Sequence, residues 1–185
     1  MPTPGIRVHG GEARGRRLVS PAGIRPSQGV VKEAIFNLLG ERLAGARALD
    51  LCAGSGALGI EALSRGAGHV TFVERGERQV AAIRRNVSSL GYGERAVVAR
   101  VDAGRWLDAH PQEVAAATLV LLDPPYNDPV LARALRVLDR FSMPRATIVV
   151  EHGARQELPP MDRLQVERSR RYGDTQVTVL TAVDA

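Results

Sequence analysis

The fold is decided by the stretch Ala48-Leu49-Asp50-Leu51-Cys52-Ala53-Gly54-Ser55-Gly56-Ala57-Leu58-Gly59-Ile60. Its apolar beginning predicts a buried strand, and apolar residues at helical spacing resume at Leu58. Between them, Gly54 and Gly56 allow a sharp turn and a close approach to a ligand, because glycine has no Cβ. A helix that begins after such a turn directs its unpaired N–H groups into the turn. The stretch therefore predicts a strand–turn–helix unit that binds a cofactor.

The acids at the ends of the apolar runs indicate which class of cofactor the turn binds. Residues 54–59 fit G-x-G-x-x-G, and Glu74 ends the next apolar run 20 residues after the first glycine, as in dinucleotide-binding proteins. However, Asp50 lies just before the turn, and Asp102 and Asp123 end two further apolar runs. These acids favour a cofactor other than NAD. An NAD-dependent dehydrogenase is an alternative, but the chain shows no evident partner for hydride transfer.

Apolar periodicity predicts the elements beyond this stretch. The expected strands are 69–73, 96–101, 118–122, 146–151, 164–170 and 176–183, and the expected helices are 27–43, 58–65, 80–90, 105–110 and 130–138, with Ser27 as the first N-cap. Alternating strands and helices that end in a hairpin predict an α/β fold. We expect a doubly wound, mostly parallel, seven-stranded sheet with an antiparallel C-terminal strand. Ligands of such sheets bind at the carboxyl ends of the strands.

The composition is that of a globular protein with a basic surface. The chain has 185 residues, 44% of them apolar, a net charge of +5 and a single lysine, Lys32, among 25 basic residues. A basic excess favours a polyanionic partner, although a general preference for arginine in the genome would also explain the scarcity of lysine. No apolar run spans a membrane, no secretory signal is seen, and there is no Cys/His cluster with metal-ligand spacing. With Cys52 as the single cysteine, we expect a cytoplasmic protein without a metal.

One domain is expected, with residues 1–24 as a basic extension and residues 25–185 as the catalytic core. Residues 6–20 predict a hairpin with its turn at His9-Gly10-Gly11. The candidate contacts to a phosphate backbone are arginines of this extension and of the C-terminal hairpin: Arg7, Arg14, Arg16, Arg17, Arg25, Arg168, Arg170 and Arg171. Arginine can donate two hydrogen bonds to one phosphate, so the extension is interpreted as an arm that binds a phosphate backbone. The alternative is an edge ribbon kept soluble by its charge.

The stretch 50–56, together with Asp123-Pro124-Pro125-Tyr126 downstream, resembles the S-adenosylmethionine-dependent methyltransferases that modify amino groups. The resemblance implies that the glycine turn faces the methionine end and ribose of the cofactor. It also implies that Asp50 meets the methionine amine, Glu74 the ribose hydroxyls and Asp102 the adenine amino group. The expected cofactor site comprises Asp50, Ala53, Gly54, Ser55, Gly56, Glu74, Arg75, Asp102, Ala103 and Asp123.

Asp123-Pro124-Pro125-Tyr126 carries the predicted chemistry. The amino group of a nucleobase is a poor nucleophile, so catalysis must orient its lone pair and stabilise the charge that develops on nitrogen. The Asp123 carboxylate and the Pro124 carbonyl can each accept one amino hydrogen, and two consecutive prolines stiffen the turn. Tyr126 offers a flat face on which a flipped base can stack. A proline-rich strand exit with a packing tyrosine is the structural alternative.

Over nearly its whole length the chain resembles the RsmD family of bacterial methyltransferases, which modify a guanine N2 of small-subunit rRNA. The resemblance rests on residues 10–16, 25–39, 53–67, 123–126 and 172–175. It implies a class I, Rossmann-like methyltransferase acting on 16S rRNA within the small subunit or an assembly intermediate, and we expect a monomer. One departure is Gln28-Gly29-Val30, where the family usually has an acid and an arginine. The alternatives are an adenine-N6 methyltransferase of DNA or RNA and a catalytically silent RNA-binding module.

Overall fold

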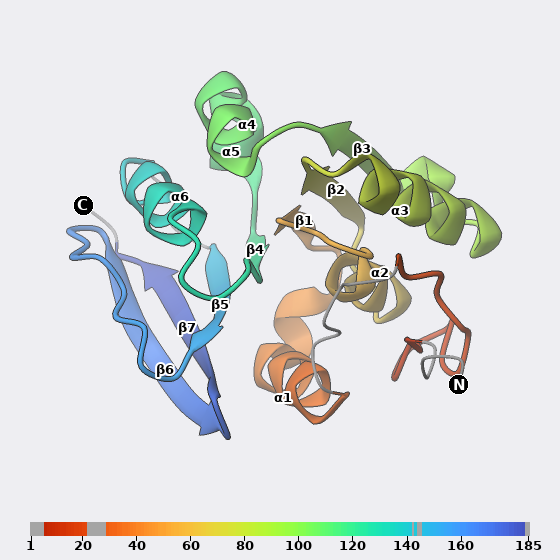
Figure 1. Ribbon diagram of the computed structural model, residues 1–185, viewed down its shortest axis with the longest axis horizontal. Coiled ribbons are helices and arrows are strands. Elements are labelled where there is room, and N and C mark those ends of the chain that lie inside the picture. The colour runs from red at the N-terminus through yellow and green to blue at the C-terminus, as the bar shows by residue number, and fades with distance from the viewer. Residues whose placement is uncertain (1–5, 22–28, 142, 144–145, 184–185) are drawn as a thin grey trace.

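The structure is a computed structural model that describes residues 6–21, 29–141, 143 and 146–183 (Figure 1). Within these residues seven strands form one sheet, in the order β3-β2-β1-β4-β5-β7-β6. The strands are β1 (Arg47–Leu51), β2 (His69–Glu74), β3 (Ala96–Arg100), β4 (Leu119–Leu122), β5 (Thr147–Gly153), β6 (Leu164–Tyr172) and β7 (Thr175–Ala182). Strands β1 to β5 are mutually parallel, and β7 pairs antiparallel with β5 and β6. The predicted doubly wound, mostly parallel sheet is therefore confirmed.

Helices cover both faces of this sheet. They are α1 (Gly29–Leu39), α2 (Ala57–Ser64), α3 (Glu77–Ser89), α4 (Ala103–Ala109), α5 (Pro111–Ala116) and α6 (Val130–Leu138), with short 3₁₀ turns η1 (Gly40–Leu43) and η2 (Gly93–Arg95). Side chains alternate along the strands, so Leu119 and Leu121 join the core beneath α1, α2 and α3, whereas Val120 and Leu122 join the core beneath α4 and α6. The result is a sheet between two helical layers (Figure 1).

Several element boundaries differ from those predicted. The first helix was expected to reach Leu43, but α1 ends at Leu39 because Gly40 has a positive φ of 49°, and the chain continues as η1. The predicted cap Ser27 and the candidate RNA contact Arg25 lie outside the described residues. Helix α5 was not predicted. Strand β6 runs two residues further than expected, so the hairpin turn consists of Gly173 and Asp174 alone.

The predicted N-terminal hairpin is present, but its turn lies at residues 12–15 rather than 9–11. Its two arms pair antiparallel through a bridge between Arg7 and Arg17 and through backbone hydrogen bonds from Val8 N to Arg16 O and from Leu18 N to Ile6 O. Its apolar side chains, which are Ile6, Val8, Ala13 and Leu18, are all buried in the core beneath α1, α2 and α3. The hairpin therefore packs against the rest of the fold.

The docking of this segment depends on Glu61, a fully buried residue of α2. Its two carboxylate oxygens accept hydrogen bonds from the backbone N–H groups of His9, at 2.8 Å, and Gly10, at 2.7 Å, and from Nε of Arg65 at 2.8 Å. Asn86 of α3 holds the other end of the segment, because its Oδ1 accepts from Val19 N and its Nδ2 donates to Val19 O. Buried polar groups are tolerated when they are hydrogen-bonded in this way.

The family departure at residues 28–30 has a local explanation here. Gly29 begins α1, and a Cβ at this position would lie 2.9 Å from Nε2 of His9. A larger residue would displace the His9 side chain, so glycine permits this packing between α1 and the N-terminal segment. Val30 beside it is 68% exposed. Gln28 lies outside the described residues.

We predict that Glu61→Gln lowers the free energy of unfolding by about 2–4 kcal/mol, because the new amide N–H₂ would face a backbone N–H and the Arg65 guanidinium would lose its buried partner. Urea unfolding at pH 7 measures this value. The control is Glu77→Gln, whose side chain is 76% exposed and which is expected to change stability by less than about 0.5 kcal/mol. Equal stability of the two variants would remove Glu61 from this role.

Candidate functional site

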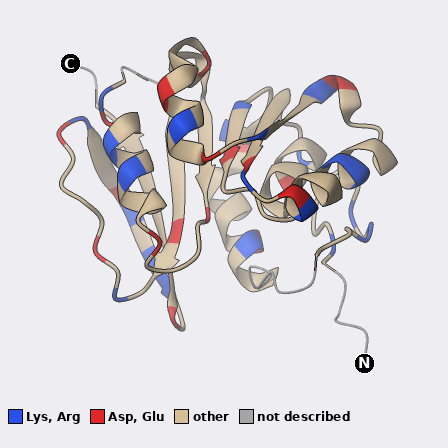
Figure 2. Cartoon of the chain, turned by 45° about the horizontal axis from the view of Figure 1, so that its top comes forward, with Lys and Arg blue, Asp and Glu red and all other residues tan. Residues whose placement is uncertain are grey.

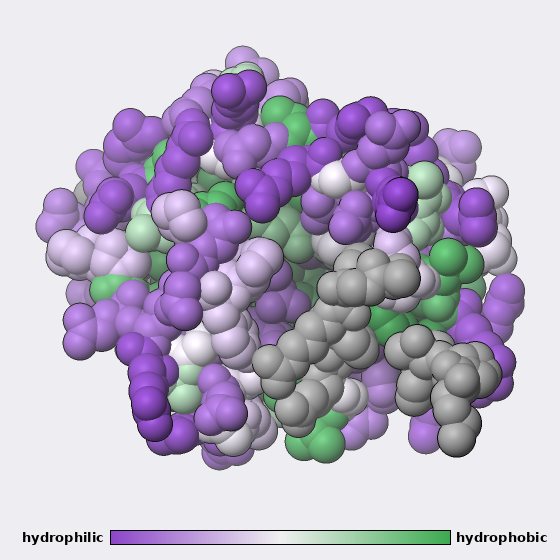
Figure 3. Space-filling model, in the orientation of Figure 1, coloured by the Kyte–Doolittle hydropathy of each residue, from purple (hydrophilic) through white to green (hydrophobic). Residues whose placement is uncertain are grey.

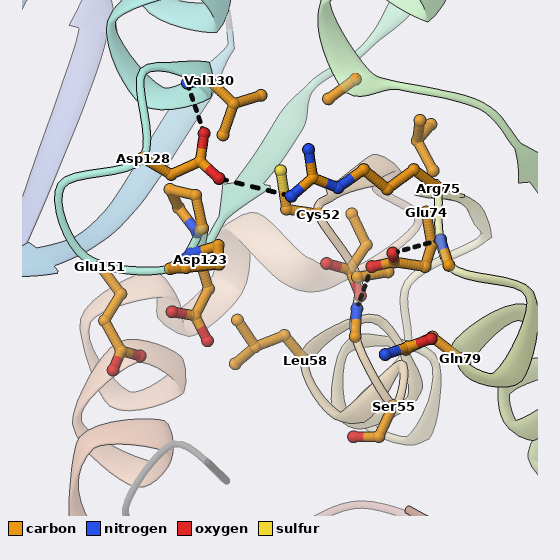
Figure 4. Close-up of a pocket in the computed structure, with 18 of the residues that line it drawn as sticks. Cys52, Ser55, Leu58, Glu74, Arg75, Gln79, Asp123, Asp128, Val130 and Glu151 are labelled. Atoms are coloured by element: carbon orange, nitrogen blue, oxygen red, sulfur yellow. Dashed lines mark hydrogen bonds and ion pairs between the residues drawn. The ribbon is translucent and has the colours of Figure 1, made fainter. Parts of the chain in front are cut away.

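A pocket of about 560 Å³ opens at the carboxyl ends of the parallel strands (Figure 4). It is large enough for a cofactor or drug-sized ligand. Its walls come from the β1–α2 turn, the ends of β2, β3, β4 and β5, helix α1 and the start of β7. Nearly all the residues expected to bind cofactor line it: Asp50, Ala53, Gly54, Ser55, Glu74, Arg75, Asp102, Ala103 and Asp123. The structure thus brings together groups that are up to 73 positions apart in the sequence.

Gly54 forms part of the pocket wall, whereas Gly56 does not. A Cβ added to Gly54, whose φ is +57°, would meet no protein atom within 4 Å, so the bare backbone faces open space. Gly56 precedes α2 and packs instead against the next layer, where a Cβ would lie 3.1 Å from Cγ1 of Ile83. Gly56 was expected among the cofactor contacts, but its position shows a packing role between α2 and its neighbours.

Asp50 lies beneath the turn and is 1% exposed. Its Oδ2 accepts a hydrogen bond from the Gly59 N–H at 2.9 Å. Burial raises the pKa of its carboxyl to about 8; the Gly59 hydrogen bond opposes the rise, and the nearby Asp123 and Glu74 add to it. Asp50 is therefore largely protonated at neutral pH until a cation approaches it.

Glu74 ties the glycine turn to the following loop. Its Oε2 accepts from the Gly54 N–H and its Oε1 accepts from the Gly76 N–H, both at 2.8 Å (Figure 4). The next residue, Arg75, reaches across the pocket to Asp128, with 3.5 Å between Nη2 and Oδ2. Arg75 thus forms part of the pocket rim, where its side chain is 67% exposed.

Asp102 is the N-cap of α4, and its Oδ1 accepts from the Arg105 N–H at 3.1 Å. It also lies 3.6 Å from Nη1 of Arg133. Capping leaves lone pairs on the carboxylate, which is 29% exposed and still faces the pocket. Ala103, the first residue of the helix, is buried beside it.

The turn Asp123-Pro124-Pro125-Tyr126 lines the same pocket. The Tyr126 hydroxyl forms a hydrogen bond with Oγ1 of Thr175, a buried residue that begins β7. Its ring lies against Gly153, where a Cβ would be 3.7 Å from the ring carbons Cγ and Cδ2. The tyrosine is therefore fixed by β5 and β7. The sequence analysis quoted Thr175 as part of a family motif but did not predict this contact.

Two buried charged residues of the pocket were also missed. Lys32 of α1 is 2% exposed and donates from Nζ to the Arg7 carbonyl at 3.3 Å, and burial lowers its pKa. Glu151 of β5 is 5% exposed. Neither stands in a recognisable motif, although Glu151 ends an apolar run in the same way as Asp123 does. With them, six acidic and two basic side chains line the pocket: Asp50, Glu74, Asp102, Asp123, Asp128 and Glu151, and Lys32 and Arg75.

The candidate RNA-binding arginines lie outside the pocket in two groups. Arg7, Arg14, Arg16 and Arg17 are exposed on the N-terminal segment, where Arg7 donates to Gly15 O and Arg16 to Ser89 O. Arg168, Arg170 and Arg171 are exposed on β6, the strand at the far edge of the sheet from β3. Other arginines are spread over the helices on both sides of the sheet, and much of the surface is hydrophilic (Figures 2 and 3). The two groups are therefore parts of a broadly basic surface.

The described residues contain neither a membrane-spanning helix nor a metal-binding cluster. No helix among them is both long and apolar enough to cross a membrane. In the same part of the chain, no group of three or more His, Cys, Asp or Glu side chains is arranged to hold a metal ion.

We predict that Asp50→Asn stabilises the cofactor-free protein at neutral pH. A carboxyl whose pKa is raised on folding contributes stability below its unfolded pKa of about 4, and this contribution is lost as pH rises towards about 8. Asparagine does not titrate, so the variant should be more stable than the wild type by about 1 kcal/mol or more at pH 7.5. Urea unfolding from pH 5 to pH 8 measures the difference, which should shrink towards pH 5. A difference independent of pH would contradict the assignment.

Comparisons with known proteins extend over nearly all of the chain. The family model "Conserved hypothetical protein 95" matches residues 6–181. "Putative rRNA methyltransferase YlbH" of Bacillus subtilis is 40% identical over 94% of this chain and 97% of its own length. "Ribosomal RNA small subunit methyltransferase D" of Escherichia coli K12 is 34% identical over 83% of this chain and 78% of its own.

Solved structures with a similar fold are also described as methyltransferases. The structure described as "Putative methyltransferase yhhF from Escherichia coli" superposes with a TM-score of 0.84 at 29% identity, over 97% of this chain and 98% of that one. An RNA methyltransferase of Salinibacter ruber with bound S-adenosyl-L-homocysteine shares the fold, with a TM-score of 0.66 at 18% identity over 87% of this chain and 95% of that one. The chain belongs to the RsmD family, that of ribosomal RNA small subunit methyltransferase D.

Proposed function

We propose that this protein transfers a methyl group from S-adenosylmethionine to the N2 amino group of a guanine in 16S rRNA. Its relatives are methyltransferases, so the reaction class is methyl transfer and the cofactor is S-adenosylmethionine. One observation carries the proposal: the Asp123–Tyr126 turn lines the same pocket as the strand-end acids Asp50, Glu74 and Asp102. Cofactor and amino-group acceptors can thus meet inside one cavity.

The pocket residues fit this cofactor. S-adenosylmethionine carries a sulfonium and an ammonium group, and the acids that line the pocket around the glycine turn, Asp50, Glu74 and Asp102, favour a ligand of positive charge. The exposed backbone of Gly54 lets a ligand lie where any larger residue would place its Cβ. Asp50 would hold the amine, Glu74 the ribose hydroxyls and Asp102 the adenine amino group. The bound cofactor supplies an electrophilic methyl group and leaves as a neutral thioether.

Asp123 and Pro124 orient and activate the amino group that accepts the methyl group. The Asp123 carboxylate and the Pro124 carbonyl each accept one hydrogen of the amino group, which turns the nitrogen lone pair towards the methyl carbon. As the N–C bond forms and the C–S bond breaks, positive charge develops on that nitrogen, and the nearby carboxylate stabilises it. Asp123 takes the surplus proton once the nitrogen is cationic, which an ordinary carboxylate can do.

Tyr126 positions the base. Its hydroxyl contact with Thr175 and its ring contact with Gly153 fix the plane of the ring before a substrate arrives. A base flipped from its RNA loop can stack on that plane, and stacking of this kind is worth about 1–3 kcal/mol per base.

The proposed substrate is 16S rRNA in the small subunit or an assembly intermediate. The protein acts on it as a monomer in the cytoplasm. The exposed arginines of residues 7–17 and of β6 contact the RNA phosphates.

We predict that Asp123→Asn lowers the rate of methyl transfer by about 10²-fold or more, because the amide cannot take a proton and offers a weaker acceptor. The dissociation constant for S-adenosylmethionine should change by less than about threefold. Single-turnover transfer of tritiated methyl to small subunits lacking the modification measures the rate, and equilibrium dialysis measures binding. The exposed Asp162→Asn serves as the control. Intact turnover with weakened cofactor binding would assign Asp123 to the cofactor alone.

We predict that replacing Arg14, Arg16 and Arg17 by alanine weakens RNA binding and lowers the slope of log K against log salt by about 2, because each lost phosphate contact removes just under one released counterion. Filter binding between 50 and 300 mM salt measures the slope. A control variant removes the same charge elsewhere, through alanine at Arg47, Arg136 and Arg140, and should keep the wild-type slope. Equal slopes for the two triple variants would exclude the N-terminal segment as the RNA contact.

A further inference from the structure

Glu151 is a buried carboxylate of the pocket to which the proposed transfer gives no role. Strands β4 and β5 are parallel and pair Leu122 with Val150, so the next residues, Asp123 and Glu151, stand at adjacent positions. Adjacent strands lie about 4.8 Å apart. Figure 4 shows the Asp123 and Glu151 carboxylates at the same end of the pocket, away from Glu74. Glu151 is thus placed beside the amino group that Asp123 would hold, not beside the ribose site.

Lys32 supplies the opposite charge at this end of the pocket. It lies on α1, is 2% exposed and lines the cavity together with Glu151. Burial lowers the Lys32 pKa, and the charges of Glu61 and then Glu151 oppose that shift, so Lys32 lies within reach of both carboxylates while its Nζ donates to the Arg7 carbonyl at 3.3 Å. An ammonium carries three hydrogen-bond donors, whereas a carboxylate only accepts. A donor and an acceptor therefore stand near Asp123 at a site otherwise walled by the stiff Pro124-Pro125 turn.

The exocyclic amino group of each base has its own neighbours on the Watson–Crick edge. In guanine the ring nitrogen beside the amino group, N1, carries a hydrogen, and O6 beyond it is an acceptor. In adenine and cytosine the ring nitrogen beside the amino group is itself an acceptor. A carboxylate next to the amino-group site therefore favours guanine, whose N1–H can donate to it. It disfavours adenine and cytosine, because a lone pair of the carboxylate would face the lone pair of the ring nitrogen with no proton between them.

We propose that Glu151 and Lys32 read the Watson–Crick edge of the target guanine. Glu151 accepts the N1–H hydrogen bond and Lys32 donates to O6, while Asp123 and the Pro124 carbonyl hold the N2 amino group. This assignment rests on the proposed function and goes beyond it, because it makes these two side chains the determinants of base specificity. The Asp-Pro-Pro-Tyr turn alone does not choose between amino-group acceptors.

The test uses small-subunit RNA in which the guanine that the wild-type protein methylates is replaced by 2-aminopurine. This base keeps the amino group at C2 but lacks O6 and has a lone pair at N1. We compare kcat/KM for the two substrates in the wild type, Glu151→Gln, Lys32→Met and the control Glu157→Gln, which makes the same chemical change at an exposed position. Binding of S-adenosylmethionine to each variant is measured in parallel and should stay within about threefold of the wild type.

The expected result is a change in preference. Glutamine at position 151 can donate to the N1 of 2-aminopurine, so the ratio of guanine to 2-aminopurine activity should fall at least about tenfold in Glu151→Gln. Lys32→Met should lower activity on guanine by about tenfold and leave activity on 2-aminopurine unchanged, because that base has no O6 to lose. Glu157→Gln should behave as the wild type.

Two results would overturn the assignment. If both pocket variants lose activity on the two substrates equally, Glu151 and Lys32 serve the structure of the pocket and not base recognition. If Glu151→Gln retains the wild-type ratio at the wild-type rate, the base binds elsewhere. Failure of the proposed function gives a different pattern, in which the wild-type protein binds S-adenosylmethionine but methylates no guanine. In that case Glu151 and Lys32 do not recognise guanine either.

Discussion

A parallel sheet brings the carboxyl ends of its strands to one edge, and the rest of this site depends on that constraint. Asp50, Glu74, Asp123 and Glu151 come from four neighbouring strands, and the topology places them around one cavity regardless of their distance in sequence. Carboxylates so close together repel one another, and burial adds to the cost, as the raised pKa of Asp50 shows. A sheet therefore assembles an acidic pocket whose own charge is poorly balanced.

That imbalance is useful to a protein that binds a cation and then releases a neutral product. While a sulfonium and an ammonium group lie in the pocket, the carboxylates are partnered, and after methyl transfer one positive charge has gone. The same acids thus favour the charged cofactor over the thioether that remains. Basic side chains counter some of these acids: Lys32 interacts with Glu151 as well as with Glu61, Arg75 reaches across the rim to Asp128, and Arg133 lies 3.6 Å from Asp102. Stability is given up here for function, because a buried acid costs free energy when the pocket is empty.

The strands, the helices and the acids at the strand ends could be predicted from the sequence, because the local residue pattern determines them. Contacts that depend on tertiary packing could not be predicted in this way. Apolar runs ending in an acid identified the strand ends and many of the acids that line the pocket, because the parallel topology follows from alternating strands and helices. The N-terminal hairpin was predicted, but its docking was not, because its arginines dominate its composition whereas four buried apolar side chains and the backbone bonds to Glu61 decide its place. Lys32 and Thr175 were missed because helix α1 and strand β7 bring them to the pocket from outside its motifs.

The buried Glu61 links the basic N-terminal segment to the helix that follows the glycine turn. It lies in α2, the helix that starts directly after Gly54 and Gly56, and its carboxylate fixes His9 and Gly10. Asn86 of α3 adds a second connection, since its Nδ2 donates both to Val19 O and to Ser55 O in the turn. A displacement of the N-terminal segment would therefore act on α2 and on the glycine turn, which form one wall of the pocket. The basic segment is not an accessory to a finished catalytic domain, because the same buried bonds hold both in place.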